Sequence, residues 1–114
     1  MGSFDVRHDS FDSWAGSLRT FREVVVRESR EKSDAAGVFW RRVNDFLRFL
    51  TKEGKEDDPD TVRLRRLFDE YAKLEDAELK KARLEILDLC LEICEKFQDE
   101  LRKKVVALSI IAAL

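Results

Sequence analysis

The last third of the chain, residues 77–114, contains neither Gly nor Pro and carries apolar residues at helical spacing along most of its length. Gly and Pro are the residues that most readily interrupt a helix, so this segment is predicted to form one long helix. At about 1.5 Å per residue, such a helix is roughly 55 Å long. No other segment of the sequence is expected to form a helix of that length, and the remaining elements must therefore pack around it.

The composition of the whole chain also favours helices. Its 114 residues include only 4 Gly and 1 Pro, whereas folds made of strands need many tight turns. Charged residues make up 40% of the chain and hydrophobic residues 44%, a balance typical of amphipathic helices around one core. The length suits a single domain, which we predict at residues 10–114 after an N-terminal arm at residues 1–9.

Apolar spacing, together with residues that start and stop helices, predicts four helices at about residues 10–32, 34–53, 59–75 and 77–112. The clearest boundaries are Ser10 as an N-cap, Gly54 as a stop, and Asp58 with Pro59 as a start. Two alternatives stay open: residues 10–53 could form one bent helix, and the helix from residue 59 could continue past residue 75 without a break. The predicted fold class is all-α, a four-helix bundle with a long C-terminal helix.

The far end of the long helix has no expected cover. The other three helices would be roughly 35, 30 and 25 Å long at about 1.5 Å per residue, so none of them covers all of it. Either the long helix breaks, or its end packs on the first helix or the N-terminal arm, or a second chain covers it. We expect an interface there, because apolar patches of this kind mark binding surfaces. The candidate interface residues are Val105, Val106, Leu108, Ile110, Ile111 and Leu114, together with Phe49 of the second helix.

Residue types that carry out catalysis or bind metals are present, but not in patterns that support those functions. His8 is the only histidine and lies in the predicted arm, which does not hold the geometry of a catalytic triad. Cys90 and Cys94 lie one helical turn apart, and zinc needs four ligands, so both are interpreted as reduced, apolar core residues. We therefore predict no enzyme activity, no metal site and no cofactor.

Charge and hydropathy argue against two classes of partner. Basic residues number 22 and acidic residues 24, a net charge of −2 with no basic half, so nucleic-acid binding is not expected. The apolar C-terminal run of about ten residues is shorter than the roughly 20 residues that a membrane span needs. The polar N-terminus has no secretory signal, and the cysteines are interpreted as reduced, which favours a cytoplasmic location.

The function class that these observations favour is a non-enzymatic protein-interaction or scaffold module, which binds a protein partner or a second copy at the end of the long helix. The alternative is a bundle that binds a small hydrophobic ligand, because aromatic residues in a bundle can line a cavity; the candidate residues are Trp14, Trp40 and Tyr71. The second half of the sequence, rich in Leu, Glu, Lys and Arg with clear capping residues, resembles designed helical proteins, whereas the first half is less regular.

Overall fold

The computed structural model describes residues 10–27, 34–74 and 76–113. The arm predicted at residues 1–9, with His8, and the candidate interface residue Leu114 lie outside these described residues. So do residues 28–33, where the first predicted helix ends and the second begins.

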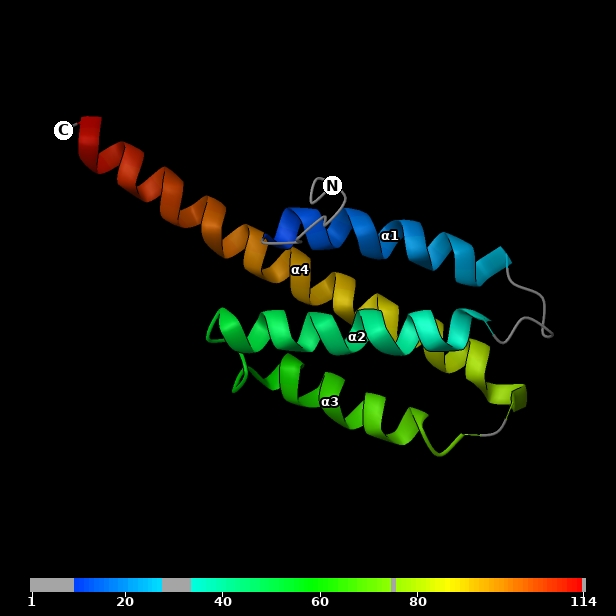
Figure 1. The fold of residues 1–114 in the computed structure, drawn as a ribbon. Coiled ribbons are helices and arrows are strands. Elements are labelled where there is room, and N and C mark those ends of the chain that lie inside the picture. The colour runs from blue at the N-terminus through cyan, green and yellow to red at the C-terminus, as the bar shows by residue number, and fades with distance from the viewer. Residues whose placement is uncertain (1–9, 28–33, 75, 114) are drawn as a thin grey trace, which may run out of the picture.

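The described chain forms four helices, α1 (Phe11–Arg27), α2 (Asp34–Lys52), α3 (Pro59–Tyr71) and α4 (Asp76–Ala113). Successive helices run in opposite directions (Figure 1), so residues 10–53 form two helices rather than one bent helix. For the same reason, the helix that starts at residue 59 does not continue into α4. The predicted all-α four-helix bundle with a long C-terminal helix is confirmed.

One predicted boundary is wrong, because α3 ends at Tyr71 and not at residue 75. The backbone N–H groups of Lys73 and Leu74 donate to the carbonyl oxygens of Glu70 and Tyr71 over 3.0 and 3.1 Å, which forms a turn. Leu74 continues the apolar spacing of α3, and this spacing is the reason why a longer helix is predicted. Its side chain does pack on the core, but from the turn that follows the helix.

Three predicted boundary residues behave as expected. Ser10 caps α1, and its Oγ accepts a hydrogen bond from the Ser13 N–H at 3.1 Å. Gly54 follows α2 with a φ of +74°, a backbone conformation that favours glycine. Asp58 caps α3 by accepting the Asp60 N–H at 2.9 Å, directly before the proline that opens the helix.

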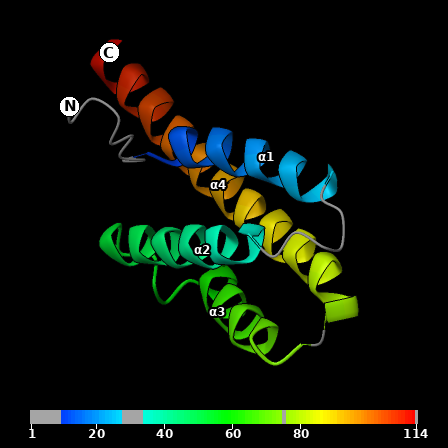
Figure 2. The same cartoon turned by 45° about the vertical axis from the view of Figure 1, so that its right-hand side comes forward.

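α4 is the element on which the other helices pack. α1 lies along it most extensively, α3 also packs against it, and α2 lies beside α3 and α4 (Figures 1 and 2). The molecule measures 60 × 37 × 22 Å and has a radius of gyration of 16.3 Å. A compact chain of this length would have a radius of gyration of about 13 Å. The molecule is therefore elongated, because the C-terminal part of α4 projects beyond the bundle (Figure 1).

Aromatic and branched side chains from all four helices fill the core. Phe39 of α2 is fully buried, and its ring centroid lies 6.3 Å from that of Phe21 in α1 and 4.9 Å from that of Tyr71 in α3. α1 contributes apolar residues that recur at steps of three and four: Phe11, Trp14, Leu18, Phe21 and Val25. α4 contributes Ile86, Leu87, Leu89, Cys90, Ile93, Cys94 and Phe97.

Polar contacts at the edge of the core fix the helices against one another. Arg22 of α1 forms an ion pair with Asp88 of α4, with 2.6 Å between Nε and Oδ1. Arg42 of α2 donates to the Ser17 hydroxyl of α1 over 2.8 Å. The first contact links α1 to α4 and the second links α2 to α1, and both add to the packing of the core.

Asp58 joins the start of α3 to α4. Its carboxylate accepts a hydrogen bond from the Lys96 ammonium at 2.7 Å, in addition to the capping bond from Asp60. Burial alone would raise the pKa of Asp58, but the hydrogen bonds from Lys96 and the backbone lower this pKa below its ordinary value. The stability that the ionised carboxylate contributes is therefore present above the unfolded pKa of about 3.9, and it is lost as the pH falls through the lower folded pKa.

Two substitutions separate the capping bond of Asp58 from its charge. Asp58→Ala removes both, and we expect it to lower the free energy of unfolding at pH 7 by about 1–2 kcal/mol. Asp58→Asn keeps a capping side chain and removes only the charge. Its free energy of unfolding should therefore fall by less than that of the alanine variant, and the difference from the parent chain should shrink as the pH falls below about 4. Urea unfolding followed by circular dichroism at pH 7 and pH 3 measures both effects. The same deficit for Asp58→Asn at both pH values would contradict the contribution of the charge.

Candidate functional site

α4 continues beyond the bundle as residues 99–113, all of which are exposed; we call this segment the α4 tail. Phe97 is the last residue of α4 in the core, with 3% of its surface exposed. At about 1.5 Å per residue the α4 tail is roughly 22 Å long. It projects past the start of α1 and the end of α2 (Figures 1 and 2). The long helix therefore does not break, and no described helix of this chain covers its end.

The core-facing side of α4 continues into the α4 tail without a change of spacing. Cys94 and Phe97 face the core, and the same spacing leads to the four residues that we call the tail stripe: Leu101, Val105, Leu108 and Ala112. Steps of three and four residues keep side chains on one side of a helix. The tail stripe is thus a direct extension of the bundle's core, but 52% of Leu101 and 66% of Leu108 are exposed.

Charged residues occur only at the root of the α4 tail, where it leaves the bundle. Arg102, Lys103 and Lys104 follow one another, and at about 100° per residue they point to three different sides of the helix. At the root of the tail, the side of the helix that carries the tail stripe is therefore the side without a charged residue. Residues 105–113 carry no charged side chain. Because the exposed residues Val106, Ile110 and Ile111 lie away from the tail stripe, the outer part of the tail is apolar on all sides except at Ser109.

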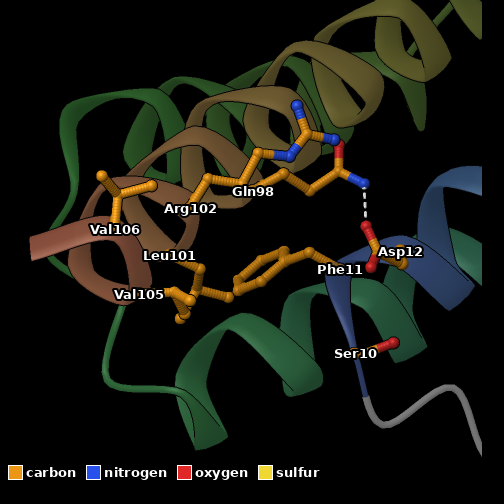
Figure 3. A pocket seen from close by; sticks show the side chains of 8 residues that line it. All are labelled: Ser10, Phe11, Asp12, Gln98, Leu101, Arg102, Val105 and Val106. Atoms are coloured by element: carbon orange, nitrogen blue, oxygen red, sulfur yellow. Dashed lines mark hydrogen bonds between the residues drawn. The ribbon is translucent and has the colours of Figure 1, made fainter. Parts of the chain in front are cut away.

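A hollow of about 400 Å³ lies at the root of the α4 tail, between α4 and the start of α1 (Figure 3). The ring of Phe11 points from α1 toward Leu101 and Val105 of α4. At the rim, the Gln98 side-chain amide donates a hydrogen bond to the Asp12 carboxylate and so links the two helices. The hollow has an apolar floor with polar groups at its edge.

A second hollow of about 330 Å³ lies on the other side of Leu101. It shares Phe11 and Leu101 with the first hollow and reaches the edge of Phe97, over whose ring the Lys55 ammonium lies at 4.7 Å. Lys104 borders this second hollow, as Arg102 borders the first. The end of the bundle therefore presents apolar atoms on both sides of α4, at the place where the tail stripe begins.

Five of the seven predicted interface residues lie exposed on the α4 tail: Val105, Val106, Leu108, Ile110 and Ile111. Of the other two, Leu114 lies outside the described residues. Phe49 is a core residue that is only 7% exposed, with its ring centroid 4.9 Å from that of Phe11 and 6.0 Å from that of Trp14. The small exposed part of Phe49 lines the second hollow beside Phe11 and Leu101, so Phe49 belongs to the root of the candidate surface and not to the α4 tail.

The three residues predicted to line a ligand cavity are not brought together. Trp14 is buried against Phe46, with 5.2 Å between ring centroids, whereas Tyr71 packs on Phe39 at 4.9 Å. Phe39 and Phe46 lie about two turns apart on α2, or roughly 10 Å. Trp40 is 53% exposed, at the surface of α2. Neither of the two hollows at the root of the tail is lined by any of the three.

The side chains that most often carry chemistry have structural roles in the described part of the chain. Cys90 and Cys94 are free, buried thiols. Burial raises the pKa of Cys94 to about 12 and raises that of Cys90 well above its ordinary value. Both thiols are therefore protonated at neutral pH. Within residues 10–27, 34–74 and 76–113, no group of three His, Cys, Asp or Glu residues is placed to hold a metal ion. No helix there is long and apolar enough to cross a membrane.

The sequence identifies the outer part of the α4 tail, but it does not identify the hollows at the root. Phe11 is recognisable as part of a buried helix face, and Leu101 as part of the stripe along the last helix. Nothing in the sequence shows that the start of α1 lies opposite Leu101, which is what forms the first hollow. The first hollow could have been predicted only by assuming that the first and last helices pair in antiparallel orientation. The start of the first helix, marked by Ser10, would then lie beside the later part of the last helix.

Comparison of this chain with protein-family models, with curated proteins and with solved structures found no match. The geometry of the α4 tail and the chemistry of its side chains are therefore what indicates a function.

Proposed function

We propose that this protein is a non-enzymatic interaction or scaffold module that binds another protein through the α4 tail. One observation carries the proposal: a helix of roughly 22 Å leaves the bundle with its core-facing stripe exposed and, from residue 105 onward, with apolar side chains on most of its other sides. A helix that is apolar all round is normally buried, and an exposed apolar surface of this size commonly marks a protein interface.

The apolar residues of the tail can supply enough free energy for a specific complex. Complete burial of a Val, Leu or Ile side chain contributes about 1.5–3 kcal/mol. Five such residues of the tail are 57–67% exposed: Val105, Val106, Leu108, Ile110 and Ile111. Covering them contributes about 1–2 kcal/mol each, or roughly 5–10 kcal/mol in total. Association itself costs several kcal/mol, so contacts in the hollows at the root are needed to reach micromolar affinity, about 8 kcal/mol.

Charge supports a protein as the partner. The chain has 22 basic and 24 acidic residues, so it lacks the positive charge from which a nucleic-acid binder gains much of its affinity. Arg102, Lys103 and Lys104 lie at the edge of the apolar surface, where rim charges set the orientation of a partner. The two free thiols suit a reducing compartment, and we place the complex in the cytoplasm.

A pair of matched baits tests the proposal. The full chain and the double variant Leu108→Asp/Ile111→Asp are immobilised and exposed to an extract of the source cells. Val62→Asp serves as a control, because Val62 is an exposed apolar residue of α3, 44% exposed and outside the tail. Each captured protein is then purified and its affinity for the three chains is measured by titration calorimetry.

We expect at least one purified partner, or the chain itself, to bind the full chain and Val62→Asp at least 10-fold more tightly than the double variant. The double variant should keep the circular dichroism spectrum of a folded bundle, since both substituted side chains are exposed. Equal binding to all three chains, or binding to none, would rule out the tail as the working surface.

A further inference from the structure

We infer that the tail stripe of one molecule packs against the tail stripe of a second copy in antiparallel orientation, so that the tip of each α4 tail lies at the root of the other. This inference rests on the proposed function, because it names the partner of the same surface. Its evidence is the spacing of the tail stripe, the placement of charges and the position of the hollows.

The spacing of the tail stripe is self-complementary. The stripe residues follow one another at steps of four, three and four, which read the same in both directions: Leu101, Val105, Leu108 and Ala112. A two-fold axis between Val106 and Ala107 therefore places Leu101 against Ala112 of the second copy, and Val105 against Leu108 of the second copy. Such a reciprocal contact is what a two-fold interface between identical chains requires.

The charges at the root favour the antiparallel orientation over the parallel one. A parallel pair would place Arg102, Lys103 and Lys104 of both copies side by side, where like charges repel. In the antiparallel pair the two basic groups are about seven residues apart along the helices, or roughly 10 Å. This separation is about one Debye length at physiological salt, so most of the repulsion is screened. The antiparallel pair also keeps the two bundles at opposite ends.

The hollows lie where the tip of the second copy arrives. When the stripes pair in this register, Ala112 of the second copy meets Leu101, which borders both hollows at the root of the tail. The small side chains of Ala112 and Ala113 allow the incoming tip to approach closely, and the hollow of about 400 Å³ beside Phe11 offers space for apolar side chains near it. The register that pairs the stripes also fills the bundle's open end.

The contact area indicates a weak dimer. A cylinder of the tail's length and of ordinary helix diameter, about 11 Å, has a side surface of roughly 760 Å². If each tail covers about half of the other, the two tails together bury roughly 760 Å². This is less than the approximately 1,200–2,000 Å² of a standard interface, so the ends of the bundles must add to it. We therefore expect dimers at protein concentrations of tens to hundreds of micromolar.

A lipid surface fits the same end of the molecule less well. Basic and acidic side chains surround the root in equal number: Lys55, Arg102, Lys103 and Lys104 against Asp12, Glu53, Asp99 and Glu100. Binding of a helix to anionic lipid needs an excess of positive charge beside its apolar face. The outer part of the tail, residues 105–113, is about 14 Å long, whereas the hydrocarbon core is about 30 Å thick.

Two measurements on the full-length chain test the inference. Light scattering from 5 to 500 µM should give a mass that rises from 13.4 kDa toward twice that value. Leu108→Asp should stay at the monomer mass at every concentration, and Val62→Asp should behave like the parent. For orientation, Leu101→Cys and Ala112→Cys chains are mixed and oxidised. The antiparallel register predicts mainly the mixed disulfide-linked dimer, because two copies of the same variant hold their new thiols about 16 Å apart. The parent chain measures the background from Cys90 and Cys94.

The outcomes separate this inference from the proposed function. A doubled mass that is lost in Leu108→Asp, together with the mixed disulfide, supports the antiparallel dimer. A monomer at all concentrations, with a different purified protein bound through the tail, overturns the dimer and leaves the proposed function in place. Preferential linking of Leu101→Cys to itself overturns the antiparallel orientation. A monomer whose tail binds vesicles of anionic phospholipid, and no protein, overturns both.

Discussion

Phe39→Ala should lower the free energy of unfolding by about 3–5 kcal/mol, the usual range for removing a buried aromatic ring. Phe39 is fully buried and lies where three helices meet, with the rings of Phe21, Phe68 and Tyr71 around it at centroid distances of 6.3, 6.4 and 4.9 Å. These residues belong to α1 and α3, so no single side-chain movement fills the cavity that is left. Domains of this size are stable by about 5–15 kcal/mol, and the loss is therefore a large share of the total.

The measurement is urea unfolding followed by circular dichroism at 222 nm, with a matched pair of controls. Phe39→Leu keeps an apolar side chain and should cost clearly less than the alanine variant. Val38→Ala shortens the neighbouring side chain, which is 43% exposed, and should change the free energy of unfolding by no more than about 0.5 kcal/mol. A loss below about 1 kcal/mol for Phe39→Ala would show that Phe39 does not join the three helices as described.

Local signals in the sequence are sufficient to predict most of the fold. Ser10, Gly54 and Asp58 each start or end a helix by contacts with residues no more than five positions away, so this local effect can be predicted without knowing the rest of the structure. The buried face of α1 follows from spacing for the same reason, since the period of a helix fixes which side chains share a side. The end of α3 is the exception, because Leu74 keeps the spacing after the helix has ended.

The edges of each apolar arc depend on neighbours that spacing does not identify. Phe49 and Trp40 lie on opposite edges of the apolar side of α2, and the sequence gives no reason to treat them differently. α1 covers the edge with Phe49, which is 7% exposed, whereas Trp40 contacts only the edge of α3, with 6.2 Å between its ring centroid and that of Phe68, and stays 53% exposed. This is why Phe49 reaches the surface only in the second hollow, whereas Trp40 lies apart from Trp14 and is exposed.

The α4 tail shows the same limit on a larger scale. The absence of Gly, Pro and charge predicts an apolar helix from residue 105 onward, and the lengths of the other helices predict that it lacks full cover. Of the explanations consistent with those facts, the arrangement of the helices rules out a break in the long helix and cover of its outer end by the first helix. Because α1 begins beside Leu101, it lies next to the root of the tail only, and even there Leu101 stays 52% exposed at the edge of the first hollow. The function of the outer tail therefore depends on what covers it in solution.

Hydrogen exchange should divide α4 into two parts at its exit from the bundle. In dilute monomer, at about 1 µM, backbone amides of residues 86–97 should exchange only when the whole bundle unfolds, because this segment supplies the α4 side chains that lie in the core. Amides of residues 102–113 need only the tail to open. An isolated helix of about 12–15 residues is marginal in water, so we expect protection to fall by at least about 1000-fold between the two parts. Mass spectrometry of peptic fragments measures this drop.

The same experiment at 500 µM links the stability of the tail to its partner. If a second copy covers the tail stripe, the protection factors of residues 102–113 should rise with protein concentration. The rise should be about the ratio of the protein concentration to the dissociation constant of the dimer, because binding stabilises the closed, helical tail. Leu108→Asp should remove this rise and leave residues 86–97 unchanged. Protection that is already uniform along α4 at 1 µM would mean that the tail is a stable helix without a partner. In that case its apolar surface would not need cover in order to fold, and concentration would not affect it.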